Sequence, residues 1–330
     1  MIKNICLVDT TYALSLYLLK MTLCEIRDTL FFVGNAIPKE ISSHLPHVIH
    51  IDMKDEDWTK SWKAKMIYRI KIMWKLSFIY FPWIKCYAQD HLSFSDIVIW
   101  NKKYTLIEDA PHAYKCVDSV VYLTPFEPYR GSTLKWRLKY HLVHGPIYGR
   151  KFGTNGQCIN RWVTTIEDLE SNYIYNKPHE YIDYIKLWTD ANEEKKIYIK
   201  EVFNVSKELI DFGQGADLLI CSQPLVEDCN LSEEEVVIIY GPHICKSGNV
   251  VIKPHPRDNF DYKKHFSQVY VMDTKAPMQL LNAMGMTFKK ALTISSTALS
   301  ALPSNTEKIY LGTKVNKKIF DVYGDLCNNV

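Results

Sequence analysis

The sequence predicts an α/β protein whose parallel sheets are covered by helices on both faces. Short runs rich in Val, Ile and Leu alternate along the chain with longer stretches in which apolar residues recur at helical spacing. Strands that are apolar on both faces are typical of parallel sheets buried between helices. The chain has 330 residues, of which 47% are hydrophobic. That length and composition favour a large core divided between two domains.

Most strand-like runs of the N-terminal half precede a charged helical region. Residues 3–8 form a strand-like run, apolar from Ile5 to Val8, that leads into Asp9 and a helical pattern, so a first strand is expected to turn directly into a helix over 11–26. Further strands are expected where short apolar runs are bounded by polar residues, at 29–34, 47–51, 96–100, 104–107 and 119–123.

A glycine-marked break separates this half from a second α/β region. Residues 178–190 and 194–210 have dense charge and helical apolar spacing, and they end at Phe212-Gly213-Gln214-Gly215. We therefore expect domains at 1–212 and 213–330. Strands of the second domain are expected at 217–222, 249–252, 269–272, 291–295 and 307–311, with helices at 232–240 and 277–286.

The composition argues against several functional classes. The formal net charge is +3 and the basic residues form no separate arm, which argues against nucleic-acid binding. The cysteines have neither CxxC pairs nor zinc-site spacing, which is typical of reduced thiols in a cytoplasmic protein. No stretch reaches the roughly 18–20 apolar residues of a membrane span. The glycine-rich phosphate loops of NAD enzymes and P-loop NTPases are absent.

The strongest chemical motif is the loop Lys253-Pro254-His255-Pro256-Arg257, which follows an expected strand. Its two prolines fix the backbone on either side of the histidine, and a stiff loop can hold a proton donor against a leaving oxygen. The flanking cations favour a bound phosphate. The alternative interpretation is a histidine that only completes a rigid turn.

A hydroxyl motif, Ser295-Ser296-Thr297, follows another expected strand and opens an expected helix. Serine is a common helix N-cap, but capping and phosphate binding use the same unpaired backbone amides. Because neighbouring parallel strands present their carboxyl ends to one crevice, the histidine loop and the serine pair are expected to meet there.

Two acidic loops are candidates for a general base. Glu108 and Asp109 follow the strand expected at 104–107, and Glu227 and Asp228 follow the strand expected at 217–222, just after Gln223. Acidic pairs in loops are more often solvated or capping residues, and Glu227 and Asp228 also precede a helix, where negative charge is favoured.

The stretch Trp62–Tyr87 mixes aromatic residues with lysines and Arg69. Such a segment can lie on an anionic membrane surface. It can equally be a helix whose aromatic face packs in the N-terminal core while its lysines face water, and the sequence leaves both interpretations open.

These motifs, in this order, resemble those of the bacterial sialyltransferases of glycosyltransferase family 52. Members share an acidic-acidic-Gly motif, a His-Pro motif and a Ser-Ser/Thr motif, which here correspond to Glu108-Asp109-Ala110, His255-Pro256 and Ser295-Ser296. The resemblance covers the C-terminal third well and the N-terminal half only through Leu106–Tyr114. It implies a GT-B fold, in which two Rossmann-like domains face each other across a cleft, usually without a metal.

The resemblance also implies roles for individual residues. His255 would be the acid that protonates the phosphate of the departing cytidine monophosphate (CMP), and Ser295 and Ser296 would hold that phosphate. Asp228 is expected to be the base, as in one branch, and Asp109 would be the base as in related families. Glu108 and Asp109 are otherwise expected to shape the acceptor or sialic acid site. Glu227 and Gln223 are assigned to the acceptor side. Lys253, Pro254, Pro256, Arg257 and Thr297 are expected around the phosphate.

Two positions depart from the family pattern. Ala110 replaces the glycine of the acidic motif, which is costly wherever the backbone needs a positive φ. Gln279 lies where the family usually has a glutamate that contacts the ribose, so the identity of the nucleotide is less firmly implied.

The function implied by the resemblance is inverting transfer of sialic acid from CMP-sialic acid to a galactose-type acceptor of a bacterial capsule or lipooligosaccharide. No cofactor or metal is expected beside the donor. The protein would be cytoplasmic, with the stretch 62–87 as a candidate contact to the inner face of the plasma membrane, and a homodimer is compatible with the sequence. The alternatives are a GT-B transferase with another nucleotide-sugar donor, or a non-catalytic glycan- or nucleotide-sugar-binding protein on this scaffold.

Overall fold

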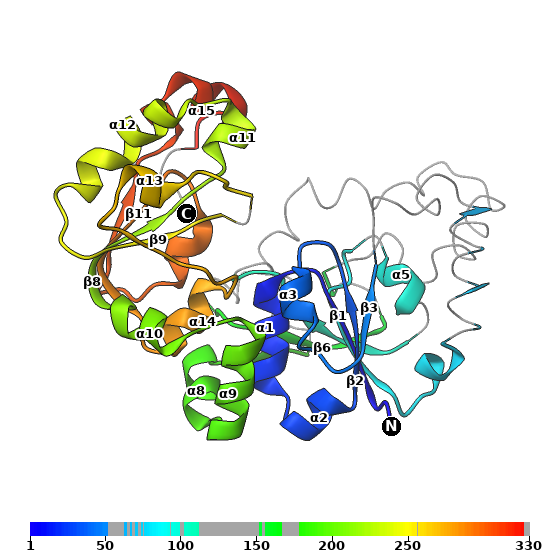
Figure 1. The fold of residues 1–330 in the computed structure, drawn as a ribbon. Helices are drawn as coiled ribbons and strands as arrows, with labels where there is room; N and C mark the ends of the chain where they lie inside the picture. Colours follow the sequence, from blue (N-terminus) through cyan, green and yellow to red (C-terminus); the bar gives the residue numbers. More distant parts are fainter. Residues whose placement is uncertain are drawn as a thin grey trace. The chain divides into compact units, whose positions relative to one another are not determined.

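The structure is a computed structural model that describes residues 1–51, 63–64, 67, 70–71, 74, 76–92, 94–99, 102–111, 152–153, 156–166, 178–255 and 257–326. The chain divides into two compact units, Met1–Val202 and Phe203–Val330 (Figure 1). The boundary predicted between residues 212 and 213 falls at the end of helix α10 (Lys207–Gly213), inside the second unit.

Among its described residues, the first unit contains a seven-stranded sheet in which every neighbouring pair is parallel. The strand order is β3-β2-β1-β4-β5-β6-β7. The chain thus adds strands on one side of β1 and then on the other, and the order reverses between β1 and β4. The strands are β1 (Asn4–Val8), β2 (Thr29–Val33), β3 (Val48–His50), β4 (Lys85–Ala88), β5 (Tyr104–Ile107), β6 (Cys158–Val163) and β7 (Glu180–Tyr181).

Helices follow and cover these strands. Strand β1 is buried along its whole length and leads into α1, whose first turn is capped by the Thr10 hydroxyl, which accepts a hydrogen bond from the Ala13 amide. Residues Tyr12–Leu19 of α1 are buried, so this helix fills the core beside the sheet. The described helical segments are α1 (Thr11–Lys20), α2 (Leu23–Arg27), α3 (Lys39–Ser42), η2 (Ser77–Tyr80), α5 (Ser95–Val98), α8 (Tyr184–Asp190) and α9 (Glu193–Val202).

Three predictions for this unit are corrected. The strand predicted at 96–100 is wrong, because Ser95–Val98 forms α5, and a short apolar run does not distinguish a strand from a buried helical turn. The single helix predicted over 11–26 is divided at Thr22, which begins α2 with a capping box to Glu25. The helix predicted over 178–190 begins only at Tyr184, because Glu180–Tyr181 forms strand β7. Strands β4 and β6 were also not predicted, and the strand predicted at 119–123 lies outside the described residues.

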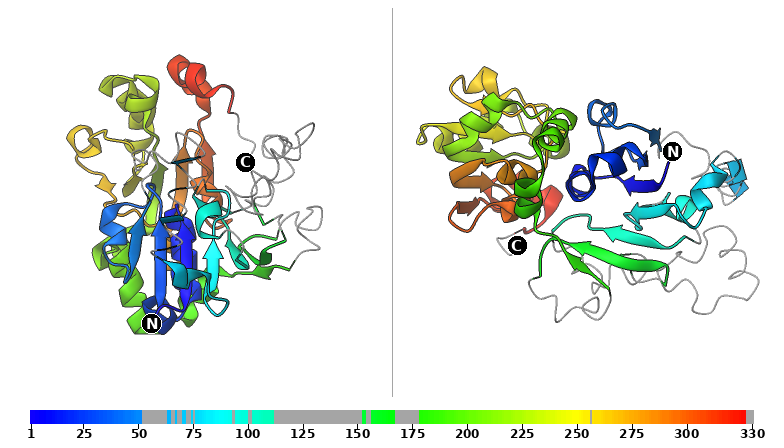
Figure 2. Two further views of the ribbon diagram at one scale, coloured as in Figure 1. Left: turned by 90° about the vertical axis from the view of Figure 1, so that its right-hand side faces the viewer. Right: turned by 90° about the horizontal axis from the view of Figure 1, so that it is seen from below.

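The second unit has, within its described residues, a five-stranded parallel sheet in the order β10-β9-β8-β11-β12. Here the order reverses between β8 and β11. Figure 2 shows the strands from two further directions. They are β8 (Gln214–Cys221), β9 (Val250–Lys253), β10 (Tyr270–Val271), β11 (Thr287–Thr293) and β12 (Glu307–Tyr310).

The core of the second unit lies between this sheet and its helices. The inner residues of β8, β9 and β11 pack with the apolar side chains of α12 and with Ile319. Helix α12 begins at a capping box between Ser232 and Glu235. The described helical segments are α10 (Lys207–Gly213), α11 (Leu225–Cys229), α12 (Glu233–Ile244), α13 (Tyr262–His265), α14 (Met278–Ala283), η6 (Thr297–Ala301), η7 (Thr313–Val315) and α15 (Lys317–Tyr323).

Candidate active site

The chemically distinctive residues of the second unit follow three adjacent strands. Gln223 comes shortly after β8, His255 after β9 and Ser295 after β11, and β8 lies between the other two strands in the sheet. In open α/β sheets, ligands bind outside the carboxyl ends of the strands at the point where the strand order reverses. This topology places the histidine loop and the serine pair at the same edge of the sheet, on either side of the loop after β8.

A buried serine and an aspartate anchor the histidine loop. The Ser222 hydroxyl donates a hydrogen bond to the Asp258 carboxylate and accepts one from the backbone amide of His255 at 3.3 Å. The Tyr262 hydroxyl donates to the same carboxylate at 2.9 Å. Burial raises the pKa of Asp258. These contacts join the end of β8 to the loop after β9 and fix where the imidazole lies.

The contacts of His255 define its tautomer. Its Nδ1 accepts a hydrogen bond from the backbone N–H of Arg257 at 3.2 Å, so the proton of the neutral ring is on Nε2. That Nε2 makes no hydrogen bond with any residue that the structure describes. Burial, and then the positive charge of Arg257, lowers the pKa of His255 below its ordinary value of 6.5. The ring is therefore a neutral hydrogen-bond donor at neutral pH.

The serine pair presents two hydroxyl groups. Ser295 Oγ accepts a hydrogen bond from Gln223 Nε2 at 2.8 Å, and Ser296 Oγ accepts one from the Ala298 amide at 3.2 Å. Because both oxygens act as acceptors, both hydroxyl protons can be donated to an anionic oxygen. The helix predicted after this pair is corrected to the short 3₁₀ segment η6, so the hydroxyls rather than a helix dipole supply the polarity. Thr297 begins η6, and its side chain lies outside the described part.

The remaining predicted phosphate residues lie around this edge of the sheet. Lys253 ends β9, and burial lowers its pKa to about 8, so it keeps its positive charge at neutral pH. Pro254 follows it and is half-buried. Gln279 lies in the first turn of α14, which contacts η6. Pro256 lies outside the described residues.

Asp228, predicted as a base, is held in an ion pair. Its Oδ1 and Oδ2 accept hydrogen bonds from the Arg257 guanidinium at 2.7 and 2.8 Å, and Oδ2 also accepts one from the Tyr323 hydroxyl at 2.8 Å. Arg257, followed by Tyr323, lowers the pKa of Asp228. The neighbouring Glu227 accepts a hydrogen bond from the Asn259 amide at 2.9 Å. Both acidic side chains of α11 therefore hold the loop that carries His255.

In the first unit, polar residues follow four adjacent strands, β1, β4, β5 and β6. Asp9 and Thr10 follow β1, Gln89 and His91 follow β4, Glu108 and Asp109 follow β5, and Thr164 follows β6. This edge includes the reversal of strand order between β1 and β4, the location favoured for ligand binding in such sheets.

Glu108 connects three of these segments. Its side chain is buried, and its Oε2 accepts hydrogen bonds from the Tyr12 hydroxyl at 3.2 Å and from the Thr164 amide and hydroxyl at 2.9 and 2.7 Å. Several donors thus hold this carboxylate in position, and Glu108 links α1, β5 and β6.

Asp109 is the more accessible carboxylate at this edge. Its side chain is 34% exposed, its Oδ1 accepts a hydrogen bond from Gln89 Nε2, and its Oδ2 is 3.8 Å from His91 Nε2. The His91 ring in turn stacks on Phe152, with 4.8 Å between ring centroids. Gln89 is itself oriented, because its Oε1 accepts a hydrogen bond from the Asp9 amide at 2.6 Å.

The alanine that replaces the family's glycine causes no backbone strain. Among the described residues, the only non-glycine residues with positive φ are Phe152, Asn204 and Asn230. Ala110 therefore has an ordinary backbone conformation, and the loop after β5 forms without the glycine.

Gly34, directly after β2, makes room for Asp9. A Cβ at Gly34 would lie 1.9 Å from Asp9 Oδ1, which accepts a hydrogen bond from the Ala36 amide. We expect Gly34→Ala to force Asp9 out of this position and to destabilise the protein by about 1–3 kcal/mol, the usual range for overpacking. Urea unfolding measures this, with Gly156→Ala as the control, since a Cβ there meets nothing within 4 Å. Equal stability of the two variants would contradict the expectation.

Several residues of both sites were not singled out from the sequence. Ser222 and Asp258 flank the expected motifs, and their pairing across the two loops has no signal in the sequence. Gln89 and His91 were missed because β4 was not predicted, although a polar pair directly after a strand is the signal that found Glu108 and Asp109.

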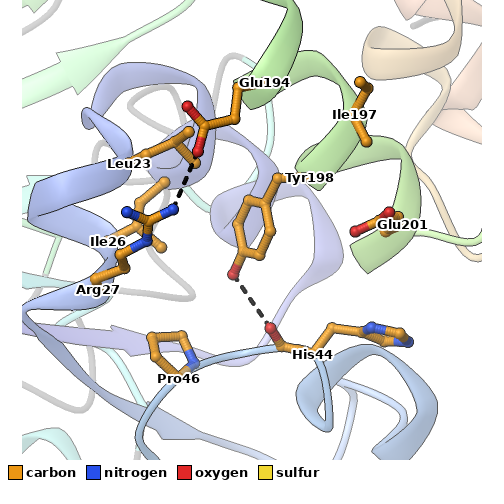
Figure 3. Close-up of a pocket in the computed structure, with 9 residues that line it drawn as sticks. All are labelled: Leu23, Ile26, Arg27, His44, Pro46, Glu194, Ile197, Tyr198 and Glu201. Carbon is orange, nitrogen blue, oxygen red and sulfur yellow. Dashed lines mark hydrogen bonds and ion pairs between the residues drawn. The ribbon is translucent and has the colours of Figure 1, made fainter.

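A separate pocket of about 290 Å³ lies elsewhere in the first unit (Figure 3). Its walls come from α2, α9 and the loop before β3, and the Arg27–Glu194 ion pair of 3.0 Å crosses its rim. Since α2 and this loop precede β2 and β3, the pocket lies at the amino-terminal end of the strands, opposite the edge that carries Asp109. Within the described residues, no group of three or more potential metal ligands occurs.

Comparison with known proteins identifies the family. The sequence model of glycosyltransferase family 52 matches residues 99–318 of this chain. An uncharacterised protein of Haemophilus influenzae is 30% identical over 242 residues, covering 73% of this chain and 72% of that protein.

Solved structures of bacterial sialyltransferases share the fold. The GT-B domain of a sialyltransferase from Photobacterium damselae is 11% identical, with 94% of this chain and 90% of that one covered, at a TM-score of 0.57. The α/β-galactoside α-2,3-sialyltransferase of Photobacterium phosphoreum is 12% identical, with 98% and 95% covered, also at 0.57. The predicted GT-B class is thus confirmed, and the chain belongs to glycosyltransferase family 52.

Proposed function

We propose that this protein is an inverting sialyltransferase that moves sialic acid from CMP-sialic acid to a galactose-type acceptor of a bacterial surface glycan. The observation that carries the proposal is that the Nε2–H of His255 follows β9 while the hydroxyls of Ser295 and Ser296 follow β11, at the same edge of one sheet and on either side of β8. All three can donate to a phosphate oxygen. Family membership and the sialyltransferase fold support the donor class.

In this reaction the acceptor hydroxyl attacks the anomeric carbon as the bond to the phosphate oxygen breaks. The acceptor proton passes to a carboxylate base, and negative charge collects on the departing phosphate. Donors that are already in position where this charge develops stabilise the transition state. His255 supplies one donor through Nε2. Protonating Nδ1 would break its hydrogen bond to Arg257, so the contacts favour the neutral ring over an imidazolium acid.

The contacts also distinguish the two candidate bases. Asp228 has both oxygens bound by Arg257, and accepting a proton would cost that ion pair. Asp109 is partly exposed and is contacted by neutral Gln89 and by His91. We infer that Asp109 is the base and that Asp228 positions Arg257 and the histidine loop.

The direct test is a donor panel. The purified protein is incubated with lactose and either CMP-sialic acid, a uridine diphosphate sugar or a guanosine diphosphate sugar, and products are identified by mass spectrometry. The proposal predicts sialyllactose and CMP only from the first donor. Transfer from another donor would instead establish a different GT-B transferase. Tight binding of CMP-sialic acid without product, over a broad acceptor panel, would favour a non-catalytic binding protein.

The serine hydroxyls are expected to act on donor binding. Ser295→Ala removes one donor to the phosphate and should raise the donor KM by about tenfold, the effect of one hydrogen bond to a charged group. Ser296→Ala should do the same. Initial rates at varied CMP-sialic acid measure this, with Ser300→Ala in the same segment as the control, since Ser300 is exposed. An unchanged KM in both variants would remove these hydroxyls from the donor site.

The galactose-type acceptor, the cytoplasmic location, the lack of a cofactor or metal and the homodimer remain predictions. Among them, only the acceptor enters the mechanism above, through the hydroxyl whose proton Asp109 takes.

A further inference from the structure

Between residues 63 and 85, the residues that the structure describes include exposed large apolar side chains, and these described residues are called here the aromatic-basic segment. Trp74 is 85% exposed and Trp83 is 65% exposed, and Ile67, Ile70 and Phe81 are also exposed. Trp and Phe side chains are usually buried at least in part, and a patch of exposed aromatic and aliphatic side chains marks a site of interaction with a protein, ligand or membrane.

The exposed residues share one helix face. The described positions between 63 and 74 are helical, and residues 67, 70 and 74 are spaced so that their side chains lie on the same side of a helix. Ala64, one turn before Ile67, packs against the core of the first unit, as do Leu76 and Phe78 farther along the chain. These three residues therefore hold the described part of this stretch on the first unit, while Ile67, Ile70 and Trp74 are exposed.

The second part of the segment is a turn with a fixed shape. Phe81 and Trp83 stack with 4.5 Å between ring centroids, and the Phe81 carbonyl accepts a hydrogen bond from Lys102 Nζ at 2.9 Å. The next residue, Ile84, is buried. The two rings are thus held at the surface by ordered neighbours, so little conformational entropy would be lost when they contact a partner.

The charge of this region is one-sided. No Asp or Glu occurs between Trp58 and Gln89, whereas the formal net charge of the whole chain is only +3. The described cations Lys71 and Lys85 are exposed. The basic residues in this range are Lys60, Lys63, Lys65, Arg69, Lys71, Lys75 and Lys85.

We propose that the aromatic-basic segment docks the enzyme onto an anionic phospholipid surface. Tryptophan prefers the interface between headgroups and acyl chains, and lysines around it are attracted to anionic lipids. A segment of this kind lies on the bilayer surface, with its apolar side chains at the boundary between headgroups and acyl chains. No helix of the described residues is long and apolar enough to cross a bilayer. The proposal is independent of the reaction catalysed. It develops the membrane interpretation, one of the two that the sequence left open, while Ile79 and Ile84 of this stretch are buried in the core.

Docking through this segment leaves the first unit's active-site edge uncovered. Trp83 precedes β4, and Gln89 directly follows it, so the two lie at opposite ends of the same strand. The carboxyl ends of β4 and β5, which carry His91 and Asp109, therefore point away from the stacked rings.

The test is co-sedimentation of the full chain with vesicles of phosphatidylglycerol and phosphatidylethanolamine, and with vesicles of phosphatidylcholine alone. We expect binding to the first and not to the second, and loss of binding as salt is raised. Trp74→Ser with Trp83→Ser should weaken binding by about tenfold or more, through lost apolar contact. Lys71→Glu should weaken it by about fivefold or more.

Matched controls lie in the second unit. Ile238→Ser removes an apolar side chain that is 71% exposed on α12, and Lys263→Glu reverses an exposed charge on α13. Both controls should bind as the wild type does. Transfer to soluble lactose should be unchanged in all four variants, which separates this proposal from the proposed function. The docking proposal would be overturned if the wild-type protein did not bind anionic vesicles, or if the tryptophan variant bound them as the wild type does. A wild-type dimer that Trp74→Ser converts to monomers would also overturn it, since the segment would then be a self-interface.

Discussion

His255→Ala is expected to lower kcat by roughly 10²–10³, the scale for losing one positioned donor to a developing negative charge. The Nε2–H of this ring has no partner among the described residues, whereas Nδ1 is occupied by the Arg257 amide. Turnover of CMP-sialic acid with lactose measures the effect. His243→Ala is the control, because that ring is also half-buried on α12 and burial likewise lowers its pKa. Near-normal turnover by folded His255→Ala would contradict the account.

His255→Gln distinguishes a hydrogen-bond donor from an acid. The amide of Gln keeps an N–H donor but has no proton to transfer near neutral pH. We therefore expect the kcat of His255→Gln to be about tenfold higher than the kcat of His255→Ala.

The pH dependence of kcat/KM distinguishes a neutral His255 ring from an imidazolium acid. The pKa of His255 lies below 6.5, so the ring is already neutral above that pH. If the neutral ring acts, wild-type kcat/KM should stay level as the pH rises through 6.5. If an imidazolium acid acts, kcat/KM should fall about tenfold per pH unit above the pKa. The second pattern, together with an inactive Gln variant, would restore the role implied by the family resemblance.

Asp109→Asn is expected to lower kcat by about 10²–10⁴, the range for a lost general base, with little change in the donor KM. The amide keeps the size of the side chain but cannot take the acceptor's proton. Initial rates at saturating donor and acceptor measure this.

Asp228→Asn is the matched comparison, since it makes the same chemical change in the second unit. The variant loses the ion pair with Arg257, so we expect a lower melting temperature and turnover within about tenfold of the wild type. If Asp228→Asn abolished transfer while Asp109→Asn left it normal, the base would be Asp228, and Arg257 would have to release it when the donor binds.

The fold was predictable where long apolar runs alternate with clear helix signals. Strands β8 and β9 lie where runs were predicted, because most of their residues are buried and polar residues bound them. Strand β11 begins four residues before the run predicted at 291–295, because its first half alternates with exposed residues. Strand β4 was missed because its sequence, Lys-Cys-Tyr-Ala, has no β-branched residue, and its partners β1 and β5 supply the pairing instead. Tertiary contacts decide such short strands, and a local pattern does not contain them.

The site was predictable in its residue types but not in its pairings. A stiff His-Pro loop and a serine pair after strands were visible in the sequence, and parallel topology places them at the same edge of the sheet. The link between Ser222 and Asp258 spans two loops, and the pairing of Asp228 with Arg257 joins two motifs that had been assigned separate roles. Such partners are set by three-dimensional proximity. The same pairing is what shifts the proposed base from Asp228 to Asp109.

The measurement that tests the central claim most directly is a ¹⁵N NMR titration of the His255 ring with CMP, assigned by comparison with His255→Ala. The account predicts a neutral ring with its proton on Nε2 in the free protein, and a large shift of that Nε2 resonance as CMP saturates the second unit. A proton on Nδ1 in the free protein, or an Nε2 resonance that does not respond to saturating CMP, would contradict it.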